Sequence, residues 1–217
     1  FDPQAEHDEE RAATVAQEIE RLSKRFAKLN NINLKTYFQL VRDLGMDKVF
    51  DKLSDENQES LALAVFITQQ LDEIQASDYS APTIHLSSVL ERVLKKSIFR
   101  ARGLVDKITQ SKNHTLGTLT FYVNNKHLLD SWPNDVNWRA LQSYCAQQLG
   151  PYTYRGKQHT FDLETFLREL DIVRLSRNKA AHSGTVDSDS YREIQQLVFQ
   201  VSDLGPGLLN AYLQALG

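Results

Sequence analysis

The chain has 217 residues, of which 41% are hydrophobic, so it is long enough for one large domain or two small ones around a real core. Nine Gly and five Pro, set against abundant Leu, Ala, Gln, Glu, Lys and Arg, favour an all-α fold over a turn-rich β architecture. The net charge of -3 excludes a surface built throughout to coat nucleic acid, but a local basic site is compatible with it.

Cysteine content and hydropathy indicate the compartment. The single cysteine, Cys145, excludes an internal disulfide and a zinc cluster of cysteines, so a reducing cytosol fits best. The chain has no run of about eighteen apolar residues, and its start is acidic and polar, unlike a secretory signal. We therefore expect a cytoplasmic protein without a membrane span. Because the first residue is Phe1 and not Met, we also expect a regulatory domain that is fused before Phe1 or associates with the chain.

A long amphipathic helix is predicted between Glu9 and Asn30. Its apolar positions alternate steps of three and four, and the seam comprises Ala12, Val15, Ile19, Leu22, Phe26 and Leu29. A seam of about three heptads suits either a coiled-coil partner or one wall of a helical bundle. The bundle is favoured, because coiled coils usually sustain the pattern for longer.

Two more helices are predicted before a polar stretch that ends in proline. One covers residues 34–44 and ends at Gly45. The next begins at about Ser54, and its buried stripe comprises Leu61, Val65, Thr68, Leu71 and Ile74. The stretch 77–82 predicts a domain boundary, which gives an N-terminal helical region over 1–80 and a second helical domain over 83–217.

The second domain begins with a strongly apolar helix face made of Leu86, Val89, Leu90, Val93, Leu94 and Ile98. Further helices are predicted at 116–123, at 138–149 after a turn at 131–135, from Leu163 behind the cap Asp162, at 188–204 and at 208–216. The segment 150–159 is predicted to be a loop or a small hairpin. Its aromatic and basic residues suit contacts with nucleic acid, but a solvated loop with two packed tyrosines is the commoner case.

The chemistry of the chain is concentrated in the run Arg177-Asn178-Lys179-Ala180-Ala181-His182, followed by Ser183-Gly184. A guanidinium suits the binding of a phosphate, and an imidazole titrating near neutrality suits proton transfer. On an ideal helix Asn178 and His182 share a face, whereas Arg177 and His182 point about 140° apart. Either the helix is interrupted near Ala181, or the arginine curls round, or the two residues serve a cleft between subunits.

The string RNKAAH resembles the signature of the HEPN superfamily, an arginine and a histidine four to six residues apart with Asn, Asp or His preferred after the arginine. The resemblance covers about Thr83 to Gly217. It implies a HEPN-like helical bundle, a homodimer that brings two motifs together, and a metal-independent endoribonuclease without cofactors, with a role in prokaryotic defence or as a toxin. RNA is cleaved by attack of its 2′-hydroxyl on the adjacent phosphate.

The resemblance also implies roles for single residues. His182 would be the general acid or base, Arg177 the phosphate binder, and Asn178 would fix the imidazole tautomer or the substrate. Glu91, which interrupts the first apolar face, would orient Arg177 or His182. A surface glutamate paired with Lys95 one helical turn later is at least as common at such a position. We expect the guanidinium and the imidazole to converge on a water-accessible pocket. The basic residues Arg92, Lys95, Lys96 and Lys179 are candidate contacts for the RNA backbone, although a solvated basic face is commoner.

Two alternatives stay open. In the first, RNKAAH is a structural helix end, in which Arg177 pairs with Glu91 or Asp171 and His182 interacts with the helix terminus. In the second, the chain is a non-catalytic helical module that binds RNA, a nucleotide or a partner protein. A metal site is not predicted, because the other histidines lack ligand spacing; these are His7, His85, His114, His127 and His159.

Overall fold

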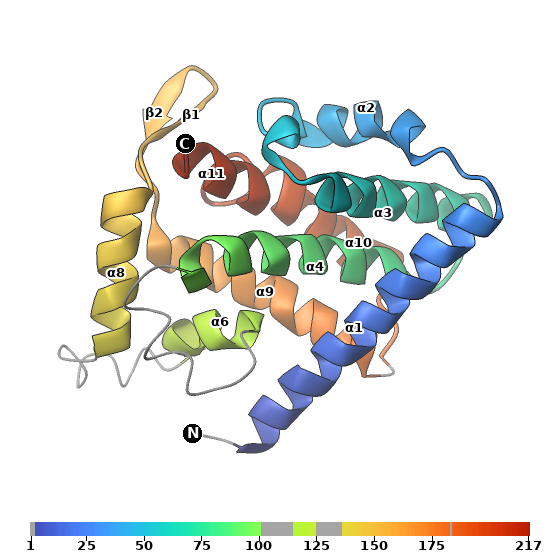
Figure 1. Ribbon diagram of the computed structural model, residues 1–217, viewed down its shortest axis with the longest axis horizontal. Coiled ribbons are helices and arrows are strands. Elements are labelled where there is room, and N and C mark those ends of the chain that lie inside the picture. The colour runs from blue at the N-terminus through green and yellow to red at the C-terminus, as the bar shows by residue number, and fades with distance from the viewer. Residues whose placement is uncertain (1–2, 101–114, 125–135, 183) are drawn as a thin grey trace.

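The computed structural model describes residues 3–100, 115–124, 136–182 and 184–217 (Figure 1). Over these residues the fold is all-α, as predicted, with one small hairpin. The helices are α1 (Pro3–Leu29), α2 (Phe38–Val41), α3 (Asp55–Glu73), α4 (Ser80–Lys96), α6 (Leu116–Asn124), α8 (Val136–Gln148), α9 (Leu163–Ala181), α10 (Ser188–Gln195) and α11 (Leu208–Ala215). Short 3₁₀ or π turns cover Leu34–Tyr37, Arg42–Met46, Phe50–Lys52, Ile98–Arg100 and Gln196–Gln200, and the strands are β1 (Tyr152–Tyr154) and β2 (Lys157–His159).

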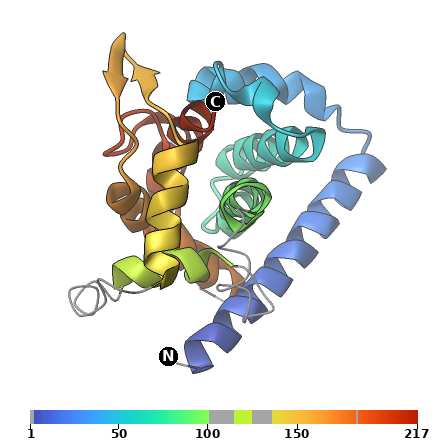
Figure 2. The same cartoon turned by 60° about the vertical axis from the view of Figure 1, so that its left-hand side comes forward.

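Helix α4 lies at the centre of the bundle and packs against α1, α3, α9 and α10. Figure 2 shows it nearly end on, with α3 and α1 on one side and α9 on the other. One hydrophobic core includes residues from both sides of the predicted boundary, among them Phe50, Leu61, Leu90, Phe166 and Tyr212. Shared packing does not test whether residues 83–217 fold alone, so the division into two domains stays a prediction.

The predicted helix signals are found at several helix ends. The carboxylate of Asp162 caps α9, and that of Asp187 caps α10. Gly45 breaks the second helix with a φ of 106°, and a Cβ there would lie 2.6 Å from the Phe199 carbonyl oxygen. The predicted turn at 131–135 lies outside the described residues.

Three helix boundaries or faces differ from the prediction. Ile74 is 74% exposed, because α3 ends one residue earlier and Ile74 is its C-cap. Helix α4 begins at Ser80, inside the predicted linker, since a proline such as Pro82 is tolerated in the first helical turn. The helical segment after Asp187 ends at Gln200 instead of Leu204.

Helix α1 forms one wall of the bundle, but only the first part of the predicted seam faces it. Of that seam Ala12 is buried and Ile19 packs against the core, whereas Leu22, Phe26 and Leu29 are 48%, 55% and 71% exposed. Ala16 and Ala27, outside the predicted seam, are buried as well. Small side chains allow α1 to approach closely, which brings its polar residues Glu9 and Glu20 onto the bundle.

The segment 150–159 contains a hairpin. Arg155 and Gly156 both have positive φ, 49° and 75°, as a two-residue type I′ turn requires. The hydroxyl of the buried Tyr152 donates to the Leu204 carbonyl at 2.6 Å, and Tyr154 is half-buried. The structure therefore has the packed tyrosines of the commoner alternative. None of the described helices combines the length and the apolar composition of a membrane span.

Candidate functional site

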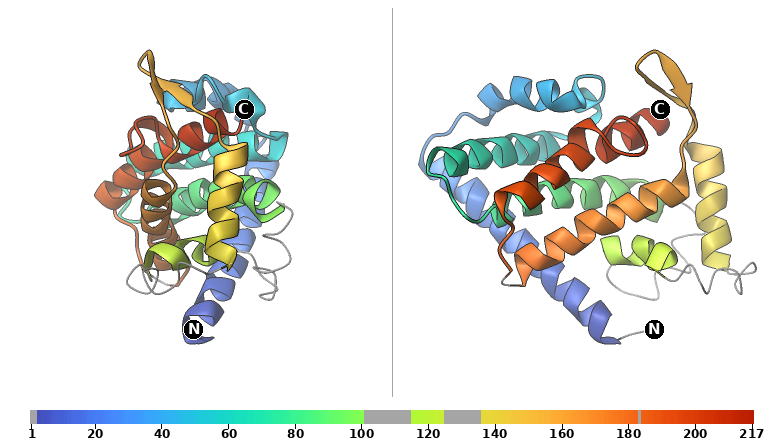
Figure 3. Two further views of the ribbon diagram at one scale, coloured as in Figure 1. Left: turned by 90° about the vertical axis from the view of Figure 1, so that its left-hand side faces the viewer. Right: turned by 180° about the vertical axis from the view of Figure 1, so that it is seen from behind.

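The motif lies at the carboxyl end of α9, beside the first half of α1, as the rear view in Figure 3 shows. The helix ends at Ala181, and His182 is its C-cap, with its N–H donating to the Asn178 carbonyl at 3.0 Å. The N–H of Gly184 also returns to the helix and donates to the Lys179 carbonyl at 3.0 Å. The interruption near Ala181 is one of the three arrangements expected from the sequence.

The carboxylate of Glu9 accepts hydrogen bonds from three side chains of α9. Its Oε1 accepts from Arg174 Nη1 at 2.8 Å and from Asn178 Nδ2, and its Oε2 accepts from Arg177 Nη2. Positions 174, 177 and 178 share one helix face, so all three donors point to the same place. Together with Glu91, these residues form what we call the Glu9 cluster.

Arg177 is 1% exposed and lies between two carboxylates. Besides its bond to Glu9, Nη1 donates to Glu91 Oε2 at 3.3 Å, and Glu91 in turn pairs with Lys95 Nζ at 3.1 Å. The predicted pair of Arg177 and Glu91 is therefore present. The other candidate carboxylate, Asp171, pairs instead with Arg174, whose Nε donates to it at 2.6 Å.

Burial and charge oppose each other at Arg174. Burial lowers the pKa of Arg174, but hydrogen bonds to Asp171 and Glu9 outweigh it and raise the pKa above the ordinary arginine value. Three buried polar atoms of the Glu9 cluster have no hydrogen-bond partner among the described residues: Arg177 Nε, Asn178 Oδ1 and Glu91 Oε1, the last of which is ion-paired with Lys95. Hydrogen-bonding capacity therefore remains unused at this place.

His182 meets the same segment of α1. Its half-buried ring places Nε2 2.9 Å from the backbone oxygen of Asp8. Because a carbonyl oxygen only accepts, Nε2 carries the hydrogen, and in the neutral ring the lone pair is on Nδ1. Arg177, Asn178 and His182 thus converge on two consecutive residues of α1, despite the angle between them on the helix.

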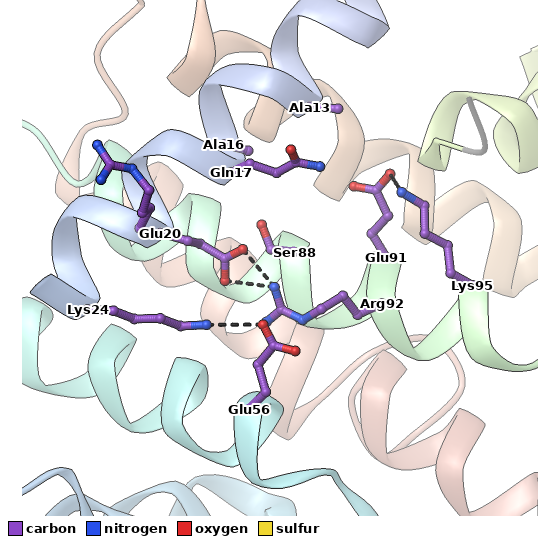
Figure 4. Close-up of a pocket in the computed structure, with 11 residues that line it drawn as sticks. Ala13, Ala16, Gln17, Glu20, Lys24, Glu56, Ser88, Glu91, Arg92 and Lys95 are labelled. Atoms are coloured by element: carbon purple, nitrogen blue, oxygen red, sulfur yellow. Dashed lines mark hydrogen bonds and ion pairs between the residues drawn. The ribbon is translucent and has the colours of Figure 1, made fainter. Parts of the chain in front are cut away.

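The expectation of an open pocket at the motif is wrong. The start of α1 covers the guanidinium of Arg177, which is 1% exposed. An open cavity of about 380 Å³ lies farther along α1, between α1, α3 and α4 (Figure 4). It is lined by Ala13, Ala16, Gln17, Glu20, Arg21, Lys24, Glu56, Ser88, Glu91, Arg92 and Lys95. Glu91 belongs to both places, since it lines the cavity and binds Arg177.

Most of the charged groups around this cavity bind one another, as the dashed lines in Figure 4 mark. Lys24 pairs with Glu56 at 3.1 Å, and Arg92 makes hydrogen bonds of 2.8 and 2.6 Å to the two carboxylate oxygens of Glu20. Arg92 also donates to Asn57 at 2.7 Å and to Ser60 at 2.9 Å. Its guanidinium thereby joins α1, α3 and α4.

The four candidate RNA contacts do not lie together. Arg92 and Lys95 line the cavity and are paired with Glu20 and Glu91. Lys96 is exposed at the end of α4, and Lys179 is exposed on the last turn of α9, beside the motif. Their contact with RNA stays a prediction, and Lys179 is the one placed next to His182.

A second polar cluster surrounds Glu20, and we call Glu20, Arg92, Ser60, Asn57 and His85 the Glu20 cluster. His85 is fully buried, and neither ring nitrogen has a hydrogen-bond partner among the described residues; Nδ1 lies 3.6 Å from Glu20 Oε1. Burial lowers the pKa of His85. Burial opposes ionisation of Glu20, but the neighbouring His85 and Arg92 hold the pKa of Glu20 at about 2.

Sequence reasoning missed Glu9, Arg174 and Glu20. Arg174 had a signal, because it precedes Arg177 and Asn178 by three and four residues and so shares their helix face. The two glutamates had none, since their contacts depend on how α1 crosses the bundle.

Comparison of the chain with protein-family models, with curated proteins and with solved structures finds no match. No group of three or more His, Cys, Asp or Glu in the described part of the chain is placed to hold a metal ion. The candidate site is therefore argued from its own residues.

Proposed function

We propose that this chain is a HEPN-type, metal-independent endoribonuclease domain that acts as a homodimer in the cytoplasm, in a prokaryotic defence or toxin system. The observation that carries the proposal is the convergence of Arg177, Asn178 and His182 on one segment of α1. A guanidinium, an amide and an imidazole that meet two consecutive residues of α1 suit the cleavage of a phosphodiester.

The proposed chemistry uses the 2′-hydroxyl of RNA. Nδ1 of neutral His182 takes the proton of the 2′-hydroxyl, whose oxygen attacks the adjacent phosphorus. The bond to the 5′-oxygen breaks, and that oxygen leaves with a proton from the imidazolium of the second motif in the dimer or from water. The products are a 2′,3′-cyclic phosphate and a 5′-hydroxyl.

Arg177 and Asn178 support this reaction by binding. The Arg177 guanidinium holds the non-bridging phosphate oxygens and the charge that builds on them. The Asn178 amide orients the phosphate from the same helix face. Glu91 is a positioning residue, because it fixes the guanidinium through Nη1 at 3.3 Å without facing the phosphate itself.

The test is cleavage of labelled RNA by the purified chain in EDTA, with DNA of the same sequence beside it. We expect RNA to be cut to 2′,3′-cyclic phosphates and DNA to survive, because DNA lacks the attacking hydroxyl. Arg177→Ala and His182→Ala are each expected to lower the rate by about 10²- to 10⁴-fold. The matched control is His159→Ala, which removes another half-buried histidine, one that stacks on Tyr152 far from the motif along the chain.

The runner-up is a non-catalytic helical module that binds RNA, a nucleotide or a partner protein. The observation in its favour is the burial of Arg177 between Glu9 and Glu91, which also suits a purely structural helix end. RNA that stays intact at every pH tested, with RNA binding unchanged in Arg177→Ala, would select this alternative. The mass in solution adds a second test, since the nuclease proposal requires a dimer.

A further inference from the structure

The donors of α9 bind a group of the chain itself, the carboxylate of Glu9. In its charge and its two oxygens this carboxylate resembles the phosphate of an RNA substrate. We propose that Glu9 occupies a phosphate subsite made by Arg174, Arg177 and Asn178. The start of α1, which carries Asp8 and Glu9, is then an autoinhibitory segment that leaves before an RNA phosphodiester binds. The inference rests on the proposed function, and it adds Arg174 as a phosphate-binding residue and α1 as the element that regulates the site.

The donors of the subsite match a phosphate. Two guanidinium N–H groups and one amide N–H, all from one face of α9, reach the two oxygens of a carboxylate. A phosphodiester presents two non-bridging oxygens that share one negative charge, and arginine binds carboxylate and phosphate with the same fork of donors. The Glu9 carboxylate therefore stands where these oxygens would bind.

The charges around Glu9 point to a monoanion. The bonded side chains of Arg174, Arg177 and Lys95 are cationic, and those of Glu9, Glu91 and Asp171 are anionic. With Glu9 in place these charges balance, and without it one positive charge is uncompensated. A buried uncompensated charge is costly, so the vacated subsite favours an anion of single charge such as a phosphodiester.

Unused hydrogen-bonding capacity is a second, independent observation. Nε of Arg177, on a side chain that is 1% exposed, has no partner among the described residues. Neither oxygen of the Glu9 carboxylate accepts a hydrogen bond from this Nε. A tetrahedral phosphate has four oxygens and can meet a further N–H of the same guanidinium.

A glycine of α6, which has no side chain, borders the subsite. Gly117 of α6 faces the Glu9 side chain, and a Cβ there would lie 2.9 Å from Cδ and 3.3 Å from Oε2 of Glu9. Real Cβ atoms do not approach other atoms so closely, so any larger residue displaces the carboxylate. Glycine at this position leaves room for the Glu9 carboxylate beside α6.

Helix α1 is held in a way that allows it to leave. Its apolar contact with the bundle uses the small residues Ala12, Ala16 and Ala27 and the partly buried Ile19, whereas Leu22 and Phe26 are exposed. Each buried methyl or methylene contributes only about 0.8 kcal/mol, so an alanine seam holds a helix weakly. The remaining attachment is polar, and elements with little buried apolar surface open at lower free energy than the core.

The first experiment measures thermal stability of the full chain with and without inorganic phosphate, at an ionic strength matched with chloride. Glu9→Ala is expected to lower the melting temperature, and phosphate is expected to raise it again in a saturable way, because an anion that binds only the folded state stabilises it. The wild type should respond only by the small general effect of phosphate on folded proteins. Arg174→Ala added to Glu9→Ala should abolish the saturable response.

Glu20→Ala is the matched control, since it removes the same charge from the same face of α1. It is expected to lose stability without saturable recovery in phosphate. Equal recovery in Glu9→Ala and Glu20→Ala, or none in either, overturns the phosphate subsite. If Glu9→Ala does not fold in any buffer, Glu9→Gln serves instead, because it keeps the shape and removes the charge; absence of recovery there overturns the subsite too.

The second experiment measures cleavage of labelled RNA by the wild type, Glu9→Ala and Glu20→Ala. The autoinhibitory segment predicts that Glu9→Ala cuts at least about tenfold faster than the wild type, since about 1.4 kcal/mol of competition gives a factor of ten. Wild-type cleavage that Glu9→Ala does not accelerate overturns autoinhibition and leaves the nuclease intact. Recovery of Glu9→Ala in phosphate, without cleavage by any variant, supports the subsite and overturns the nuclease.

Discussion

Glu9 and Glu20 lie eleven residues apart on one face of α1, about three helical turns, and each binds an arginine of the bundle. In the Glu20 cluster His85 is fully buried beside the carboxylate, and Arg92 donates from all three of its nitrogens. Next to the Glu9 cluster, His182 is half-buried and contacts the backbone of Asp8, and Arg177 retains an unpartnered Nε among the described residues.

The difference separates a structural clamp from a candidate site that contains the same residue types. In the Glu20 cluster the guanidinium is satisfied, and the two unpartnered ring nitrogens of His85 are fully enclosed. A guanidinium with a spare donor, beside an imidazole that is only half-buried, can still engage a ligand. Neither residue identity nor unused bonding capacity alone therefore marks a site, since both clusters have them; the spare donor on the arginine and the access of the imidazole do.

The largest expected effect comes from replacing each arginine by methionine, which keeps most of the volume. Arg92→Met is expected to lower the free energy of unfolding by about 3–5 kcal/mol, because Glu20 then lies buried with only the Ser60 hydroxyl as a donor. Arg177→Met is expected to cost less, about 1–3 kcal/mol, because Glu9 keeps Arg174 and Asn178. Urea denaturation followed by circular dichroism measures both values.

Cleavage of RNA should show the reverse order for the same two variants. Below its melting temperature Arg92→Met should still cleave, slowed at most by the loss of one contact with the RNA backbone, whereas Arg177→Met should not cleave. A larger stability loss in Arg177→Met than in Arg92→Met, with equal effects on cleavage, would remove the distinction between the two clusters.

The next effect is the dependence of the free energy of unfolding on pH, to which Glu20 and His85 of the Glu20 cluster contribute. The pKa of Glu20 is about 2 in the folded chain and 4.5 as the ordinary value. The unfolded chain therefore binds more protons between these values, and stability falls as the pH falls from 4.5 toward 2. Glu20 contributes on the order of 3 kcal/mol to the free energy of unfolding, and this contribution is fully present above pH 4.5.

Protonation of His85 adds to the loss of stability in acid, and this loss begins at a higher pH than that of Glu20. Burial lowers the pKa of His85 below its ordinary 6.5, so its contribution is fully present above pH 6.5 and is lost as the pH falls. Glu20→Gln should flatten the curve of unfolding free energy against pH below 4.5 and leave the fall that starts near 6.5. Parallel curves for Glu20→Gln and the wild type would contradict the role given to Glu20.

The sequence predicted most of the helices, because spacing and caps are local properties. The caps Asp162 and Asp187 and the break at Gly45 are where the pattern placed them. The face by which the second half of α1 packs was predicted wrongly, since Ala27 is buried there and Leu22, Phe26 and Leu29 are exposed. The choice between the two faces depends on the partner surface, which no local pattern contains.

The candidate site was predictable only within the motif and its nearest partner. The pairing of Arg177 with Glu91 followed from a carboxylate that interrupts an apolar face. Glu9 lies 168 residues before Arg177, and an acidic residue on an amphipathic helix is ordinarily a solvated one. Its role follows from the tertiary arrangement, and so does the covering of the expected pocket.

The smallest expected effect is a coupling between Gly117 and Glu9, measured by a double-mutant cycle. Gly117→Ala alone should change the free energy of unfolding by less than about 1 kcal/mol, because the gain in helix propensity offsets the displacement of the Glu9 carboxylate. In the Glu9→Ala background the carboxylate is gone, so the same change should stabilise by about 1 kcal/mol. The coupling energy is the difference between the two backgrounds.

The corresponding cycle between Gly117 and Glu20 is the control, because Gly117 approaches Glu9 and not Glu20. Residues without shared partners add within about 0.3–0.5 kcal/mol, so this second coupling should vanish within error. Equal couplings would mean that Gly117 acts on α1 as a whole and not on the space that the carboxylate occupies. Coupling to Glu9 alone locates the effect at the proposed phosphate subsite, since only there does the added methyl group compete with an anion for the same space.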